Sequence, residues 1–452
     1  MNFSFPFSNV DFSWFFNKFV IFLTVFSIVA VMSLNSNFQM GLIRESLLSA
    51  NSKLVIFSLY VLTFTLTGLL LLKSTDLSIQ GIKRETRRIY SFSIYIIYFI
   101  LSFMLILTVV QISVSNSYSN VVFYITAYVS FTTSMAYLII LSFKFFQLYL
   151  HRKNYLTLLY GILFALFCMS LLLILIYLIN GLATLPSVIE STSPRELIAG
   201  QYSVNVQFQN NIAKAYDLFF FTSFLLAWAL SVILLKQYIR RIGIYKFWLL
   251  TSLPLFFHLM RYASILNLES FIPSGTNNIP SNLGQAISTS LINSDVQIGG
   301  IFFGISFLII ALKLKSSQLR RIMIIVVIGI MLLFGARDFH SIFVPSVPPG
   351  GVVTICFMAI GSYMLLSSLV SFVKLASRDK QLYTDLIHRV ENDSILVKNL
   401  ISAEREIQTF SVVKPLLDYS VQWQKSHSYE ELTLEEVKDI IEDIRVELKK
   451  KN

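Results

Sequence analysis

Apolar runs of about 20 residues recur along the sequence, and they constrain the fold more than any other feature. A helix needs about 20 apolar residues to cross a bilayer, and only 13% of this chain is charged, against roughly 25% in ordinary soluble domains. The pattern predicts an all-α, polytopic transmembrane helix bundle of about ten spans. The predicted spans are 15–34, 54–72, 90–113, 121–141, 155–179, 218–235, 247–266, 296–312, 322–339 and 352–370.

The first apolar run, 15–34, has two interpretations, because an N-terminal apolar run can also be a cleaved signal peptide. Its positive flank consists of Lys18 alone, and residues 31–36 make a poor cleavage site. We therefore expect an uncleaved helix. The two cysteines both lie inside apolar runs, so no disulfide framework is expected.

Basic residues are concentrated in alternate loops, and this distribution predicts the orientation of the chain. The basic residues behind the net charge of +11 lie mainly in the loops between spans. The charge therefore does not indicate a nucleic-acid-binding surface. Because basic loops stay on the cytoplasmic side, we expect a plasma-membrane protein with both termini in the cytoplasm. Sixteen basic residues fall in one set of loops, at positions 73, 83, 84, 87, 88, 144, 152, 153, 236, 240, 241, 246, 313, 315, 320 and 321, and four in the other, at positions 44, 53, 195 and 214.

The chain becomes polar after the last span, which divides it into a transmembrane domain, 1–375, and a cytoplasmic helical tail, 376–452. In the tail, apolar residues recur three, four or seven apart, which is typical of a short coiled coil or helix bundle. A second tail helix begins with a capping box at Thr433 and Glu436. These helices can pack on each other, on a second subunit or on a partner protein. The first apolar stripe comprises Leu386, Val390, Val397, Leu400, Ala403, Ile407 and Phe410.

Several polar residues lie inside or at the end of predicted spans, where charges are energetically unfavourable and commonly functional. His258 and Arg261 lie three residues apart on the seventh span, and Arg337 is followed by Asp338 and His340 on the ninth. A rise of about 1.5 Å per residue places both groups at nearly equal depth in the outer half of the membrane.

Two interpretations of these five residues remain open. In the first, they form an outward-facing pocket in which the two arginines bind an anionic group of a ligand. In the second, Arg261 pairs with Asp338 for structural reasons, and the remaining polar side chains extend to the outer headgroups.

Small residues in the spans have a simpler interpretation, because they let helices approach closely in lipid. Gly300 and Gly304 have the small-xxx-small spacing, and Gly361 lies in the last span. We predict that these glycines lie at helix contacts.

Motifs that would indicate catalysis are not found in the sequence: there is no His-Glu-x-x-His zinc motif and no glycine-rich phosphate loop. We therefore predict a protein that is not an enzyme and has no cofactor or metal. Its partners are the lipid bilayer and, through 376–452, a cytoplasmic protein or a second copy. The predicted function is a sensor-like or scaffolding role that couples the transmembrane domain to the tail. The alternative is a transporter or channel for a small anion or lipid.

The C-terminal region resembles a group of uncharacterised multi-span membrane proteins of ammonia-oxidising archaea. The resemblance rests on a Pro-Pro turn at 348–349, a last span that contains Gly361 and Ser362, and a polar tail that begins with Ser377. It covers about a fifth of the chain and implies an archaeal plasma membrane, without indicating any chemistry.

Overall fold

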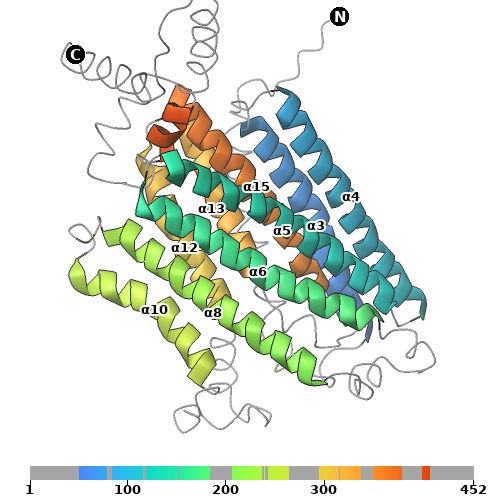
Figure 1. Ribbon diagram of the computed structural model, residues 1–452. Helices are drawn as coiled ribbons and strands as arrows, with labels where there is room; N and C mark the ends of the chain where they lie inside the picture. Colours follow the sequence, from blue (N-terminus) through green and yellow to red (C-terminus); the bar gives the residue numbers. More distant parts are fainter. Residues whose placement is uncertain are drawn as a thin grey trace, which may run out of the picture.

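The computed structural model is a bundle of α-helices (Figure 1). No strand occurs in the part of the chain that the structure describes, so the predicted all-α class is confirmed there. The described residues are 50–78, 84–115, 119–151, 153–183, 206–236, 239, 243–263, 295–314, 316–336, 350–378 and 400–407.

The long helices within these residues overlap the predicted spans from the second to the tenth, and several of them extend beyond the predicted bounds. The first predicted span, 15–34, lies outside the described residues. The helices are α3 (Ala50–Ser78), α4 (Arg84–Ser115), α5 (Asn120–His151), α6 (Tyr155–Ala183), α8 (Val206–Lys236), α10 (Ile244–Ala263), α12 (Asp295–Lys313), α13 (Ser317–Gly335) and α15 (Gly350–Arg378).

Seven of the described helices are long and apolar enough to cross a membrane, namely α3, α4, α5, α6, α8, α13 and α15. The apolar stretches of α10 and α12, Phe247–Met260 and Val296–Leu312, are shorter. The outward face of α4 carries Phe92, Phe99 and Phe103 with exposed fractions of 70%, 71% and 54%. Such a face is suited to lipid and not to water. The chain is therefore an integral, multi-pass membrane protein.

Helix α15 is the centre of the bundle, with α3, α4, α5 and α13 packed around it (Figure 1). Every side chain from 351 to 369 is buried. Helix α13 approaches α15 most closely where Gly329 meets Gly361. A Cβ atom added to Gly361 would lie 3.0 Å from the backbone nitrogen of Leu333 and 3.1 Å from the carbonyl oxygen of Gly329. The two backbones are thus in direct contact.

Helix α12 packs on α13 in the same way. A Cβ atom on Gly300 would lie 2.7 Å from Cβ of Phe334, and one on Gly304 would lie 2.6 Å from Met331. The prediction that Gly300, Gly304 and Gly361 serve helix packing is therefore confirmed.

Polar side chains between helices donate hydrogen bonds to backbone carbonyls, which satisfies them inside the membrane. Ser130 on α5 donates to the carbonyl of Ile355 on α15 at 2.6 Å. Trp228 on α8 donates to the carbonyl of Thr251 on α10 at 2.7 Å. These hydrogen bonds fix the register of helix pairs whose contacts are otherwise apolar.

The turn between α12 and α13 is fixed by local hydrogen bonds. The guanidinium of Arg320 donates two of them to the carbonyl of Leu314, at 3.0 and 2.8 Å, and Ser316 caps the start of α13. Between α8 and α10, Gly243 adopts a φ of 88°, which glycine tolerates without strain.

We call the end of the bundle at which Lys73, Lys236 and Arg321 lie the basic end, which faces the upper part of Figure 1.

Replacing Gly361 with alanine should destabilise the bundle by about 1–3 kcal/mol, because backbone atoms that cannot rotate away would have to separate. Gly161→Ala is the matched control, since the atoms nearest to its new Cβ would be those of the Phe146 ring, at 3.2–3.4 Å, and not backbone atoms. Thermal unfolding of the purified proteins in detergent measures both. Equal transition temperatures for the two variants would contradict a direct backbone contact.

Candidate functional site

The five residues predicted to form an outer polar site are described only in part. His258 lies on α10 and is fully buried. Arg261 lies on the same helix, but its side chain is outside the described part of the structure, as are Arg337, Asp338 and His340 in full. The predicted meeting of these residues, whether as an anion pocket or as a structural ion pair, stays a prediction.

The imidazole of His258 is held between phenylalanine rings of α8. It stacks on Phe224 with a centroid distance of 3.7 Å and an angle of 17° between the planes, and Phe220 and Phe221 lie 5.6 and 5.5 Å away. Stacked rings of this kind bury large areas and fix side-chain orientation. The described surroundings of His258 are therefore those of a packed aromatic cluster.

Aromatic contacts continue from His258 across the bundle. Phe224 meets Phe303 on α12 at 5.4 Å, and Phe303 meets Phe334 on α13 at 4.6 Å. Phe334 in turn meets Phe167 on α6 at 4.9 Å. These edge-to-face pairs make a continuous row of rings from α10 to α6. The row connects the predicted site to a cavity inside the bundle.

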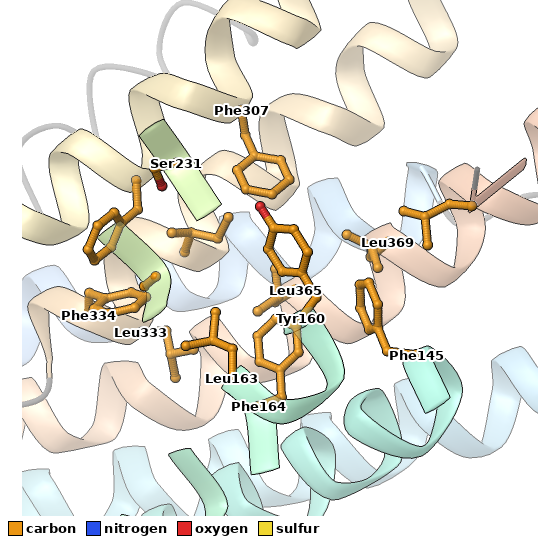
Figure 2. A pocket seen from close by; sticks show the side chains of 14 residues that line it. Phe145, Tyr160, Leu163, Phe164, Ser231, Phe307, Leu333, Phe334, Leu365 and Leu369 are labelled. Carbon is orange, nitrogen blue, oxygen red and sulfur yellow. The ribbon is translucent and has the colours of Figure 1, made fainter. Parts of the chain in front are cut away.

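The cavity has a volume of about 30 Å³, and Figure 2 shows the side chains that line it. Six helices and the segment 400–407 form its wall. Its lining is almost wholly aromatic and aliphatic, and the only hydroxyl groups among the lining side chains are those of Tyr160 and Ser231. The lining residues are Phe145, Tyr160, Leu163, Phe164, Ala227, Ser231, Phe303, Phe307, Ile330, Leu333, Phe334, Leu365, Leu369 and Leu400.

Tyr160 gives this cavity its one unusual feature. The residue is 4% exposed, and its hydroxyl has no hydrogen-bond partner among the described residues. Figure 2 shows the hydroxyl pointing away from Phe164 and toward Phe307. A buried hydroxyl without a partner loses its hydration without compensation, which is unfavourable by about 1–3 kcal/mol. Tyr160 is therefore a polar group that stands out from its surroundings.

Removing this hydroxyl should not destabilise the protein. We expect Tyr160→Phe to unfold at the same temperature as the wild type or at a higher one. Tyr98→Phe is the matched control, because the Tyr98 hydroxyl donates a hydrogen bond to the carbonyl of Thr65, and its loss should lower stability by about 0.5–1.5 kcal/mol. Thermal unfolding in detergent compares the two. A decrease as large for Tyr160→Phe as for Tyr98→Phe would show that the Tyr160 hydroxyl has a partner.

The helical segment 400–407, here called the terminal segment, packs against the bundle. Leu400, Ile401 and Ala403 are only 3%, 2% and 2% exposed, and Ile407 packs on the same core. Leu400 and Leu369 of α15 both line the cavity. Of the apolar stripe predicted for the tail, Leu400 and Ala403 are therefore buried, and Leu400 shares a cavity wall with transmembrane helices, a neighbour that the periodicity did not indicate.

A polar cluster joins α3, α4, α5 and α15 near the basic end. Ser91 on α4 donates a hydrogen bond to the carboxylate of Asp76 on α3 at 2.5 Å, and Tyr95 also hydrogen bonds to Asp76. Tyr363 on α15 faces Ser91, and its ring lies 5.6 Å from that of Tyr137 on α5. The cluster satisfies a carboxylate at the edge of the membrane, where an isolated charge would be unfavourable.

Ser91→Ala should lower stability by about 1–3 kcal/mol, because hydrogen bonds to charged groups are stronger than neutral ones. Ser113→Ala is the control, since Ser113 is exposed and bonds only within its own helix, to the carbonyl of Val109. Its effect should stay within about 0.5 kcal/mol. Thermal unfolding of both variants tests this, and a Ser91→Ala variant as stable as the control would contradict a bond of that strength.

Sequence reasoning missed Tyr160 and Leu400 as site residues, and it placed Asp76 outside its span. The helical span extends to Asp76, four residues beyond the predicted end. The sequence did offer a signal for this residue, because its carboxylate lies next to basic residues at the boundary of the span. Tyr160 gave no signal, because tyrosines are common near membrane interfaces. No group of three or more His, Cys, Asp or Glu side chains that could hold a metal occurs among the described residues.

Comparisons with family models, with curated proteins and with solved structures each found no match.

Proposed function

We propose that this protein is a non-enzymatic, sensor-like membrane protein in which the transmembrane helices control the docking of the C-terminal tail. The observation that carries the proposal is the burial of Leu400 at the wall of the internal cavity, beside Leu369 of α15. A segment of the tail thus forms part of the transmembrane core. In the predicted orientation, the basic end and the docked segment face the cytoplasm.

The packing of α15 supports this coupling. Because α13 and α15 touch through Gly329 and Gly361, neither helix can move far without displacing the other. Leu365 and Leu369 on α15 and Leu333 on α13 share the cavity wall with Leu400. A shift of either helix therefore changes the surface on which the terminal segment rests. Release of this segment would present Leu400, Ala403 and Ile407 to a cytoplasmic partner.

The alternative function, transport of a small anion or lipid, depends on Arg261 and Arg337 facing one another across the outer half of the membrane. Both side chains lie outside the described part of the structure. The docked terminal segment favours the sensor-like function, because a transporter has no evident use for it.

Cysteine accessibility tests the coupling. In protein with Cys168 and Cys356 replaced by alanine, a Leu400→Cys variant should react with a membrane-impermeant maleimide at least about tenfold more slowly than a Ser317→Cys variant. Ser317 is exposed at the same end of the bundle, whereas a buried cysteine reacts only through local opening. Adding Gly361→Ala should accelerate labelling at position 400 and leave position 317 unchanged.

Three results would contradict the proposal. Equal reaction rates at positions 400 and 317 would show that the terminal segment does not dock. Slow labelling at position 400 that Gly361→Ala leaves unchanged would show docking without coupling. Anion or lipid flux in vesicles that is lost in Arg261→Gln and retained after deletion of 376–452 would establish the transporter instead.

A further inference from the structure

The internal cavity results from the small side chains that α8 contributes to its wall. Among the lining residues, only Ala227 and Ser231 are small, and they lie one turn apart on α8. The other helices contribute aromatic rings and branched aliphatic side chains (Figure 2), and the terminal segment adds Leu400. A space of about 30 Å³ is left where these large side chains meet the small ones of α8.

The surface that lines this space is almost wholly apolar. The Tyr160 hydroxyl has essentially no accessible surface, and Ser231 is only 2% exposed. A buried water typically makes about three hydrogen bonds, which such a wall does not offer. Water is therefore a poor occupant, because apolar cavities of this kind stay dry and accept small apolar molecules instead.

The size of the cavity limits what it can hold. One water requires roughly 10–15 Å³ on the same measure, so about 30 Å³ corresponds to roughly two or three waters. That is room for a molecule of about three heavy atoms. Packed interiors leave few spaces larger than a water, and the atoms that line an empty one lack partners on that side. An apolar occupant supplies the missing contacts.

We propose that the cavity binds a small, uncharged, wholly apolar molecule of about three heavy atoms or fewer, such as a dissolved apolar gas or a short alkane. Dispersion contacts with Phe307, Phe334 and Leu369 hold it. Molecules of this class concentrate in the bilayer around the helices, because their transfer from water into an apolar environment is favourable. No polar group takes part, so the size of the cavity selects the ligand.

Occupancy of the cavity also affects the terminal segment, and this part of the proposal rests on the proposed function. Leu400 belongs to the cavity wall, so a bound molecule gives its side chain contacts that an empty cavity does not provide. The ligand therefore stabilises the docked position of 400–407 and opposes its release.

Xenon tests the site, because it is small and apolar and its anomalous scattering reveals its position. Crystals of the full-length protein are pressurised with xenon, and we expect an anomalous peak in the cavity of the wild type. Ala227→Leu, which fills the space with an isobutyl group, should lower the xenon occupancy at least about fivefold. Ala136→Leu is the matched control and should leave the occupancy unchanged, since Ala136 is exposed on α5. Ala227→Val replaces the leucine variant if that variant does not fold.

Four results would overturn the site. The absence of a peak in the cavity would show a packing void that accepts no ligand. Equal occupancy in Ala227→Leu and Ala136→Leu would show that xenon lies outside this space. Ordered water in the cavity of unpressurised crystals would show that the wall is hydrated. Tubular density that continues from the cavity to the bilayer would identify the end of a lipid chain as the occupant.

Cysteine labelling tests the effect on the tail separately. Ala403→Cys keeps Leu400 in the wall and replaces another buried residue of the terminal segment, with Cys168 and Cys356 again replaced by alanine. In lipid nanodiscs, saturating xenon should slow maleimide labelling at position 403 at least about threefold, because labelling requires local opening. Nitrogen at the same pressure should have no effect. Xenon should also have no effect when Ala227→Leu is added, since the space is then already filled.

The two experiments distinguish failure of the site from failure of the proposed function. A xenon peak without any change at position 403 would retain the site and overturn its link to the tail. A xenon peak together with equal labelling at positions 400 and 317 would retain the site although the proposed function had failed. No peak, together with Gly361-dependent protection at position 400, would retain the coupling and remove the ligand.

Discussion

The contact between Gly329 and Gly361 is the constraint on which the rest of the bundle depends. In lipid, helices gain no hydrophobic driving force by associating, so close packing and hydrogen bonds must hold them together. Two glycines bring the backbones of α13 and α15 to within about 3 Å of a Cβ position. This proximity lets α15 occupy the centre, where α5 reaches it through the hydrogen bond from Ser130 to the Ile355 carbonyl.

A centrally placed α15 links features that lie far apart in the sequence. Its Tyr363 faces the polar cluster around Asp76, while Leu365 and Leu369 line the cavity that Leu400 closes. Because one rigid helix contributes to both regions, a displacement at one is transmitted along the backbone to the other. The aromatic row from His258 through Phe224, Phe303 and Phe334 reaches the same cavity, which Phe303 and Phe334 line. The central helix, the aromatic row and the terminal segment therefore all meet at the wall of one small cavity.

The candidate site was less predictable than the fold. His258 was singled out because an ionisable side chain inside a span is unusual, and the structure shows it fully buried. Its stacking on Phe224 could not be foreseen, since Phe224 looks like an ordinary member of an apolar run on another helix. Tyr160 could not be found for the same reason, because a hydroxyl becomes notable only when its neighbours offer no partner. Leu400 was placed in a tail stripe, and periodicity reveals an apolar face without revealing what covers it.

The sequence by itself determined the class of the protein and the places of its helices. Runs of apolar residues long enough for a bilayer must form helices, because every backbone group has to be hydrogen bonded within the chain, and the described helices overlap the predicted spans from the second to the tenth. The tertiary structure alone decided which helix is central, which hydroxyl is left without a partner and which surface holds the terminal segment. These depend on how side chains from separate helices fit together, and a one-dimensional pattern does not encode that fit.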